Sequence, residues 1–314
     1  MTQQSSYWQK IAIVLLLAAC AFFVYSRFAN KPEIKAPSSG TTAISAKDPD
    51  QKVANIPKSE TAPAKQIAAA PSAAAYNSSA NLRSLLDSLQ GDSSKKRDYD
   101  LVKAKAFEEC FIFTRQPNYA NDVVQSRKAM NKGSPDVLQK FADTLTQRCR
   151  DVANSGPISL KESKSLYAEA AKEGSPEAMA HQLRSTLVLG QDKTSIDDLR
   201  SKSIDLINTG DPAAIFELSG AFGSNSKFSG AAVGSEKATA AWQLVACDMG
   251  LDCSANSALI AGACLNGGMY CEPGDLRYNM QQGQFSPSDY EEVLALETAI
   301  YSQITNGKTA MLFR

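Results

Sequence analysis

The sequence predicts an all-α fold of antiparallel helix hairpins, preceded by a disordered linker and a single N-terminal transmembrane helix. Three observations predict this fold class. Apolar residues recur at helical spacing through residues 81–314, where the alternating runs typical of β-hairpins are not found. Glycine-centred turns divide the same residues into segments of similar length. An unbroken apolar run from Ile11 to Tyr25 stands near the N-terminus.

Residues 1–28 are expected to anchor the chain in a membrane. The run IAIVLLLAACAFFVY, with Trp8 and Phe28 as interfacial flanks, approaches the ~20 residues that span a bilayer. A single-pass, uncleaved signal anchor in a bacterial inner membrane is therefore the first hypothesis. A lipoprotein is the second, because LAAC has the form of a bacterial lipobox that would make Cys20 a lipidated N-terminus. A cleaved signal peptide is the third.

Residues 29–80 are predicted to form a disordered linker. They hold six of the thirteen prolines, many small and polar residues, and one aromatic residue, Tyr76. Such a composition buries too little apolar surface to offset the conformational entropy lost on folding. The folded domain is therefore expected to comprise residues 81–314, with a cysteine-rich part at 242–272.

The stretch from Ser165 to Leu189 is predicted to form a helix, a tight turn and a second helix. Gly174 can take a positive φ just past the first helix, Ser175 can cap the second, and Pro176 suits its first turn. Related turns occur at Gly133, Gly174, Gly210 and Gly250, at intervals of 41, 36 and 40 residues. Intervals of this size are typical of helical-hairpin repeats.

This stretch also resembles a known repeat family. Its aromatic residue, small residues and turn glycine are similar to the pattern of the Sel-like repeat, a relative of the tetratricopeptide repeat, at Tyr167, Ala170, Ala171, Gly174, Ala178 and Ala180. The other units lack the double alanine, so the resemblance covers one unit well and the rest loosely. It implies an α-solenoid with a scaffolding or adaptor role. A generic helix bundle with similar turns is the alternative.

Periodicity and turn residues predict the remaining helices in chain order. Leucines from Leu82 to Leu89 form a first apolar stripe, and residues from Leu101 to Ile112 form a second. Further helices are expected at 121–131, 135–152, 160–173, 176–189, 194–208, 212–221, 235–249, 254–265, 275–282 and 287–305. The glycine- and serine-rich residues 222–234 are the main internal loop, either a binding loop or an insertion.

Six cysteines follow the apolar run, and their spacing favours three disulfides: Cys110–Cys149, Cys247–Cys253 and Cys264–Cys271. A zinc site would favour closer cysteines and a histidine, and buried reduced cysteines are the other alternative. Disulfides need an oxidising compartment, so the domain is expected in the periplasm. The charge bias opposes this placement, since three basic residues follow the apolar run and one precedes it.

No motif indicates a catalytic residue, a metal site or a cofactor site. The only histidine, His181, is expected to pack within the repeat-like stretch, and acidic doublets such as Glu108–Glu109 are expected on solvated helix faces. Phosphate-binding, dinucleotide-binding and zinc-protease motifs are not found. The chain has 33 basic and 33 acidic residues, so it lacks the excess of basic residues that is typical of nucleic-acid-binding proteins.

Two functional hypotheses follow. The first is a membrane-tethered periplasmic adaptor or scaffold that binds a protein or peptide partner of the cell envelope in a concave groove. The second is a cell-envelope enzyme acting on glycan, with carboxylates that the fold brings together. Carboxylates converging in a deep cleft would favour the enzyme, and a broad concave surface lined by aromatic residues and methionine would favour binding.

Overall fold

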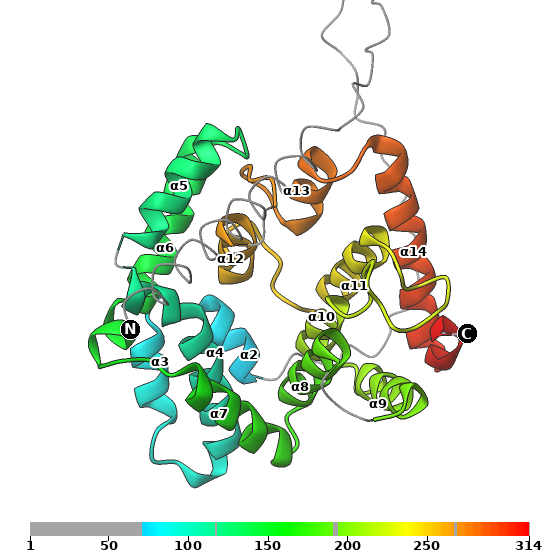
Figure 1. The fold of residues 1–314 in the computed structure, drawn as a ribbon, viewed down its shortest axis with the longest axis horizontal. Coiled ribbons are helices and arrows are strands. Elements are labelled where there is room, and N and C mark those ends of the chain that lie inside the picture. The colour runs from blue at the N-terminus through cyan, green and yellow to red at the C-terminus, as the bar shows by residue number, and fades with distance from the viewer. Residues whose placement is uncertain (1–70, 117, 191–193, 267–268, 314) are drawn as a thin grey trace, which may run out of the picture. The chain divides into compact units, whose positions relative to one another are not determined.

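The computed structural model describes residues 71–116, 118–190, 194–266 and 269–313. These residues contain thirteen α-helices and no β-strand, so the predicted all-α class is confirmed for them (Figure 1). None of the helices described is both long enough and apolar enough to cross a bilayer. The predicted anchor at 1–28, including Cys20, lies outside the described residues, as does most of the predicted linker.

The helices follow one another with short connections. The first group is α2 (Pro71–Ser78), α3 (Leu82–Leu89), α4 (Lys96–Arg115), α5 (Tyr119–Ala129) and α6 (Pro135–Asn154). The second is α7 (Leu160–Lys172), α8 (Pro176–Leu189), α9 (Ile196–Asn208) and α10 (Pro212–Ser219). The third is α11 (Glu236–Asp248), α12 (Ala258–Leu265), α13 (Leu276–Gly283) and α14 (Pro287–Thr305). Each range predicted between 121 and 305 overlaps one of these helices.

Turn chemistry sets several of these boundaries. The Ser175 side chain accepts a hydrogen bond from the Ala178 amide at the start of α8, and Asp211 caps α10 in the same way. Gly174 and Gly210 have φ values of 86° and 71°. In this left-handed region a side chain is disfavoured, so glycine ends the preceding helix at low cost. The predicted turn geometry is confirmed at both positions.

The predicted linker extends too far along the chain. Residues 71–78 form helix α2, and the Tyr76 side chain is only 5% exposed. The Tyr76 hydroxyl donates to Glu109 of α4, and Arg148 of α6 donates to the Tyr76 carbonyl. Composition missed this helix because its order depends on partners that come later in the sequence. The domain boundary at residue 81 is therefore wrong, since α2 packs with the domain.

Helices that are near one another in the sequence pack side by side, and one late helix packs against the first group. α4 packs against α6 and α7, α7 against α8, α8 against α10, and α10 against α11. α12 then packs against α5 and α6. The Tyr119 hydroxyl of α5 donates to the Asn266 side chain at 2.9 Å, across a separation of 147 residues. In a linear repeat array each unit contacts only its neighbours. The packing of α12 against α5 and α6 is therefore a contact that a linear array would not have.

The loop at 222–234 is part of the core. Phe222 and Phe228 are buried beside Trp242 and Phe313, with ring centroids 4.9–6.2 Å apart. The Trp242 indole donates to the Ala232 carbonyl at 2.8 Å. The loop therefore packs as a structural insertion between α10 and α11.

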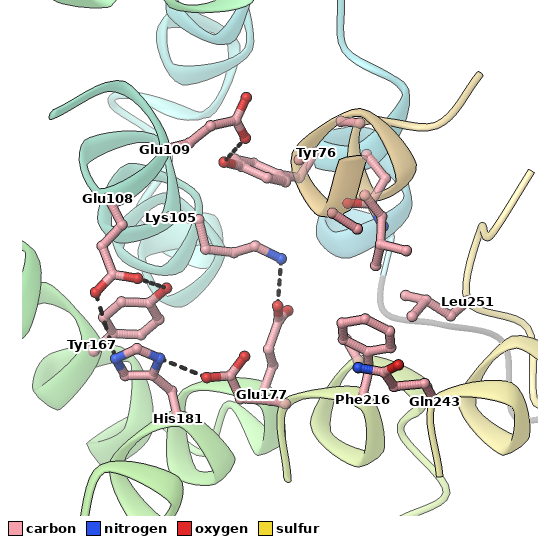
Figure 2. A pocket seen from close by; sticks show the side chains of 17 residues that line it. Tyr76, Lys105, Glu108, Glu109, Tyr167, Glu177, His181, Phe216, Gln243 and Leu251 are labelled. Carbon is pink, nitrogen blue, oxygen red and sulfur yellow. Dashed lines mark hydrogen bonds and ion pairs between the residues drawn. The ribbon is translucent and has the colours of Figure 1, made fainter. Parts of the chain in front are cut away.

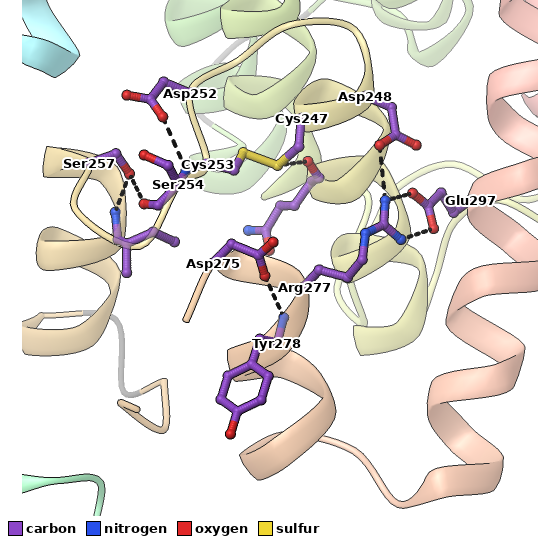
Figure 3. The surroundings of a disulfide bond; sticks show 12 residues. Cys247, Asp248, Asp252, Cys253, Ser254, Ser257, Asp275, Arg277, Tyr278 and Glu297 are labelled. Carbon is purple, nitrogen blue, oxygen red and sulfur yellow. Dashed lines mark hydrogen bonds and ion pairs between the residues drawn. A yellow bond between two sulfur atoms is a disulfide. The ribbon is translucent and has the colours of Figure 1, made fainter. Parts of the chain in front are cut away.

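The three cysteine pairs favoured by sequence spacing lie at disulfide distance. Cys110 of α4 and Cys149 of α6 have Cα atoms 5.2 Å apart. Cys247, near the end of α11, pairs with Cys253 in the following loop, with Cα atoms 5.7 Å apart (Figure 3). Cys264 of α12 pairs with Cys271, with Cα atoms 5.6 Å apart. One pair therefore joins two helices, and the other two fix the segments that follow α11 and α12.

Candidate functional site

A cavity of about 440 Å³ lies where α2, α4, α7, α8, α10, α11 and α12 meet (Figure 2). Its polar lining includes Tyr76, Lys105, Glu108, Glu109, Tyr167, Glu177, His181 and Glu217. Its apolar lining is Ala213, Phe216, Leu251, Ala258, Leu259, Gly262 and Ala263. This volume, and the combination of apolar walls with polar groups, are typical of small-ligand sites.

Helical spacing brings the polar side chains to the same place. Lys105, Glu108 and Glu109 are three and four residues apart on α4, and Glu177 and His181 are four residues apart on α8. Residues at these spacings share one face of a helix. α4 and α8 therefore each present a polar face to the cavity, and Figure 2 shows Lys105 and Glu177 pointing toward each other across it.

The imidazole ring of His181 has contacts at both nitrogens and on one face. Its Nδ1 lies 2.8 Å from Glu217 Oε1, and its Nε2 lies 3.6 Å from Glu108 Oε1. The Tyr167 ring stacks on the imidazole, with centroids 3.7 Å apart and planes 7° apart. The Tyr167 hydroxyl donates to the second oxygen of Glu108. The expected packing of His181 is therefore combined with a place in the wall of a polar cavity.

Glu217 is the carboxylate that His181 contacts most closely. Its Oε1 also pairs with Arg184 Nε at 2.8 Å. Burial alone would raise the pKa of the Glu217 carboxyl, but the hydrogen bond from His181 and the charge of Arg184 outweigh burial and lower that pKa below 4.5. An ionised carboxylate only accepts hydrogen bonds, so Nδ1 of His181 carries the hydrogen.

Glu177 is the most deeply buried carboxylate of the lining. It is 8% exposed, and its Oε1 pairs with Lys105 Nζ. Its other oxygen, Oε2, has no hydrogen-bond partner among the described residues. Burial raises the pKa of the Glu177 carboxyl above 4.5, and the positive charge of Lys105 offsets only part of this. The cavity therefore contains a buried acceptor atom that the surrounding protein leaves unpaired.

Glu109 has a structural partner behind the cavity. Arg148, which is 1% exposed, pairs with Glu109 Oε1 at 2.9 Å, and the Tyr76 hydroxyl donates to Oε2 at 2.6 Å. The guanidinium also donates to the Tyr76 carbonyl. A buried charge needs such pairing, because removing one partner leaves the other uncompensated. This group ties α2, α4 and α6 together at one side of the cavity.

The carboxylates of the lining outnumber the cations that contact them. Glu108, Glu109, Glu177 and Glu217 face three permanent cations, Lys105, Arg148 and Arg184. The site therefore holds four carboxylates against three permanent cations, with His181 between two of the carboxylates. In a partly buried site, charges act with less screening than at an open surface. The cavity therefore favours positively charged groups.

The structure separates the predicted turn glycines from this site. Gly174 and Gly210 end α7 and α9, and Gly250 follows α11 with a φ of 111°. Gly133 has a φ of 130° and lies against Cys271, whose carbonyl accepts from the Ser134 amide at 2.8 Å. None of these glycines lines the cavity. They set the angles between helices that do.

Sequence reasoning missed most of the lining. Glu108 is exposed, as expected of a solvated face, and it also lines the cavity. Glu109 was expected on the same face but is paired with a buried arginine. A charged residue within an apolar helix was an available signal, and Glu217 in AAIFELSG is one. The spacing of Glu177 and His181, four residues apart in an alanine-rich helix, was another.

Metal-binding chemistry has no support in the described residues, where no three histidine, cysteine or acidic side chains are arranged to hold an ion. Comparisons with models of protein families, with curated proteins and with solved structures find no match to this chain. Its function is therefore argued from the cavity.

Proposed function

We propose that this chain is a binding protein, a helical-repeat adaptor that receives part of a protein or peptide partner in the cavity. The observation that carries the proposal is the combination, in the cavity described above, of an apolar lining with polar side chains that internal hydrogen bonds and ion pairs hold in place. Side chains fixed before binding lose little entropy when a partner arrives.

The α-solenoid and Sel-like assignments form part of this proposal. The α7–α8 hairpin, which carries the resemblance, supplies Tyr167, Glu177 and His181 to the cavity. Helical-repeat proteins usually bind partners on the surface formed by adjacent units, although fold alone does not determine function. Residues at the repeat-like turn therefore shape the proposed binding site.

We further propose that the domain is tethered in the periplasm. The apolar run within residues 1–28 would anchor it in the inner membrane, with lipidation at Cys20 as the alternative. The three cysteine pairs at disulfide distance suit an oxidising compartment. The partner is then a protein or peptide of the cell envelope.

Site-specific photocrosslinking tests the adaptor function. The photoreactive residue p-benzoylphenylalanine replaces Phe216, which lines the cavity, and in a second strain Phe285, which does not. Both positions are partly buried phenylalanines, so the two variants are matched. We expect illumination of intact cells to yield a defined partner adduct at Phe216 only. Equal adducts at both positions, or none at Phe216, would contradict binding through the cavity.

A glycan-acting enzyme is the second candidate, because carboxylates do converge on this cavity. Glu177 and Glu217 both line it, and their surroundings shift their pKa values in opposite directions, upward for Glu177 and downward for Glu217. Such a separation is how an acid and a base are assigned in glycan hydrolysis. Each carboxylate is also held by a protein cation, which is why binding remains the first proposal.

Glycan digestion separates the two candidates. The full chain in detergent is incubated with purified cell-wall glycan, and soluble fragments are measured by chromatography. A binding protein releases none. Release by the wild type that is lost in both Glu177→Gln and Glu217→Gln would replace the adaptor proposal with the enzyme.

A further inference from the structure

The chemistry of the cavity identifies the kind of group that it can receive. Glu177 Oε2 is a carboxylate oxygen of a residue that is 8% exposed, and it has no hydrogen-bond partner among the described residues. A buried acceptor without a donor is costly, whereas a donor that arrives with a ligand removes the cost. A ligand at this point must therefore donate hydrogen bonds.

The surrounding charges favour a cationic donor. Glu217 lies close enough for its negative charge to act on Glu177, and Lys105 is already committed to Oε1 and lies 4.5 Å from the centroid of the Tyr76 ring. Four carboxylates belong to the lining, and three permanent cations contact them. A carboxylate or phosphate ligand would meet like charge from four glutamates, whereas an ammonium group would complete their pairing.

The apolar lining favours an aliphatic chain behind that cation. Phe216 and Leu251 lie on the other side of the cavity from Glu108 and Tyr167 (Figure 2). α12 adds Leu259, Gly262 and Ala263. A Cβ atom placed on Gly262 would have no atom within 4 Å, so the lining is open at this point. Methylene groups gain favourable free energy when they leave water for such a surface.

We propose that the cavity binds an aliphatic ammonium group, with the cation at Glu177 Oε2 and its methylene chain along the apolar face of α10 and α12. The source is either a small alkylamine or a lysine side chain presented by a peptide. This proposal rests on the function proposed above, because it names the chemical group through which a partner enters the cavity.

Calorimetric titration of the full chain in detergent tests the proposal. The probes are n-pentylammonium, the neutral n-pentanol and the anionic pentanoate, all of one chain length. We expect saturable binding of n-pentylammonium at least ten-fold tighter than that of the other two, since only it pairs with the carboxylate. Equal binding of pentanol, or no binding of the ammonium, would overturn the proposal.

Three variants locate the binding. Glu177→Gln keeps the shape and an acceptor for Lys105 but removes the charge, and we expect at least ten-fold weaker binding of the ammonium. Gly262→Leu fills the open space on α12 without altering a carboxylate, and it should abolish binding, with Gly262→Ala intermediate. Glu291→Gln removes an exposed carboxylate outside the cavity and should leave binding unchanged. Unaltered binding in Glu177→Gln and Gly262→Leu, with thermal unfolding like that of the wild type, would place the ammonium elsewhere.

A peptide distinguishes the two sources and separates this proposal from the adaptor function. Acetyl-Gly-Lys-Gly-amide presents the lysine side chain, and the same peptide acetylated on that side chain is its control. Binding of both the peptide and the amine assigns the shared group, and binding of one alone assigns the source. If the Phe216 crosslink is lost in Gly262→Leu but no ammonium compound binds, the adaptor proposal is retained and this ligand class is rejected. If ammonium compounds bind but no partner is crosslinked, this ligand class is retained and the adaptor proposal is rejected.

Discussion

Gly133 is constrained by a neighbour that its turn motif does not reveal. Its φ of 130° is nearly that of Gly156, at 134°. A Cβ on Gly133 would lie 2.8 Å from the Cys271 Cβ and 2.9 Å from its carbonyl carbon, whereas a Cβ on Gly156 would have no atom within 4 Å. Both positions disfavour a side chain by conformation, but only Gly133 also lies against another segment.

Gly156→Ala is therefore a matched control for Gly133→Ala. We expect Gly133→Ala to lower the free energy of unfolding by about 1–3 kcal/mol more than Gly156→Ala, because the added methyl group must displace the Cys271 backbone. Urea denaturation followed by circular dichroism measures both values. Equal losses would mean that the close approach to Cys271 contributes nothing to stability.

Glu217 gives the cavity a pH dependence whose sign follows from its lowered pKa. The pKa of the Glu217 carboxyl is lower in the folded protein than its ordinary value of 4.5. Its ionised form therefore contributes to the free energy of unfolding, and this contribution is fully present at pH values above 4.5. The contribution is lost as the pH falls through the folded-state pKa. Its partners are His181 and Arg184, on the neighbouring helix α8.

Glu217→Gln should therefore flatten the acid side of the stability profile. We expect the wild type to exceed this variant in free energy of unfolding near neutral pH. The difference should shrink as the pH is lowered from about 6 to about 3, because both proteins then lack the ionised carboxylate. Chemical denaturation at several pH values measures the difference. A difference that grows on acidification would contradict the assigned direction of the pKa shift.

At the scale of elements, local sequence predicted the helices well and the cavity poorly. Ser175 and Asp211 are caps whose partners lie three residues away, so a turn motif is enough to place α8 and α10. Glu109 instead pairs with Arg148, 39 residues later, and Tyr76 depends on both. Helix starts were therefore predictable from neighbouring residues, whereas the burial of Tyr76 and the pairing of Glu109 required contacts that form only in the fold.

The disulfide pairs differ in the length of chain that each one closes. Cys110 and Cys149 are 39 residues apart, and Cys247 and Cys253 are 6 apart. In the chain-entropy model a bridge restricts the unfolded chain more when its loop is longer. The model gives about 4 kcal/mol for the first pair and about 2 kcal/mol for the second.

Replacing each pair by alanines tests this difference between elements. The Cys110→Ala/Cys149→Ala variant should lose about 2 kcal/mol more stability than Cys247→Ala/Cys253→Ala in urea denaturation of the oxidised proteins. The same variants measured after reduction, beside the reduced wild type, provide the control. Without disulfides, only the loss of side-chain packing should distinguish the two variants in stability. A larger loss from the short pair would show that strain or packing outweighs loop entropy.

At the scale of the whole domain, the return of α12 is what encloses the cavity. α12 packs against α5 and α6 and contributes Ala258, Leu259, Gly262 and Ala263 to the lining. The segment that leads to it is fixed by the Cys247–Cys253 pair (Figure 3). Leu251, between these cysteines, also lines the cavity (Figure 2). The helical periodicity and the turn residues do not predict that α12 packs against α5 and α6, because these patterns describe each helix and its nearest neighbour in the sequence. The Cys247–Cys253 pair therefore fixes part of the cavity wall, and a disulfide there requires an oxidising compartment.

The number of free thiols in the full chain tests that compartment directly. The chain has seven cysteines, of which six lie in the three pairs and the seventh is Cys20. A periplasmic domain on an intact anchor should therefore show one thiol when native membranes are denatured in an alkylating reagent without reductant and the mass shift is read. Lipidation of Cys20 would reduce that number to zero and add the mass of a lipid. Seven labelled thiols would place the domain in a reducing compartment and would contradict the periplasmic proposal. That result would agree with the positive-inside rule, which favours a cytoplasmic location for the basic residues that follow the apolar run.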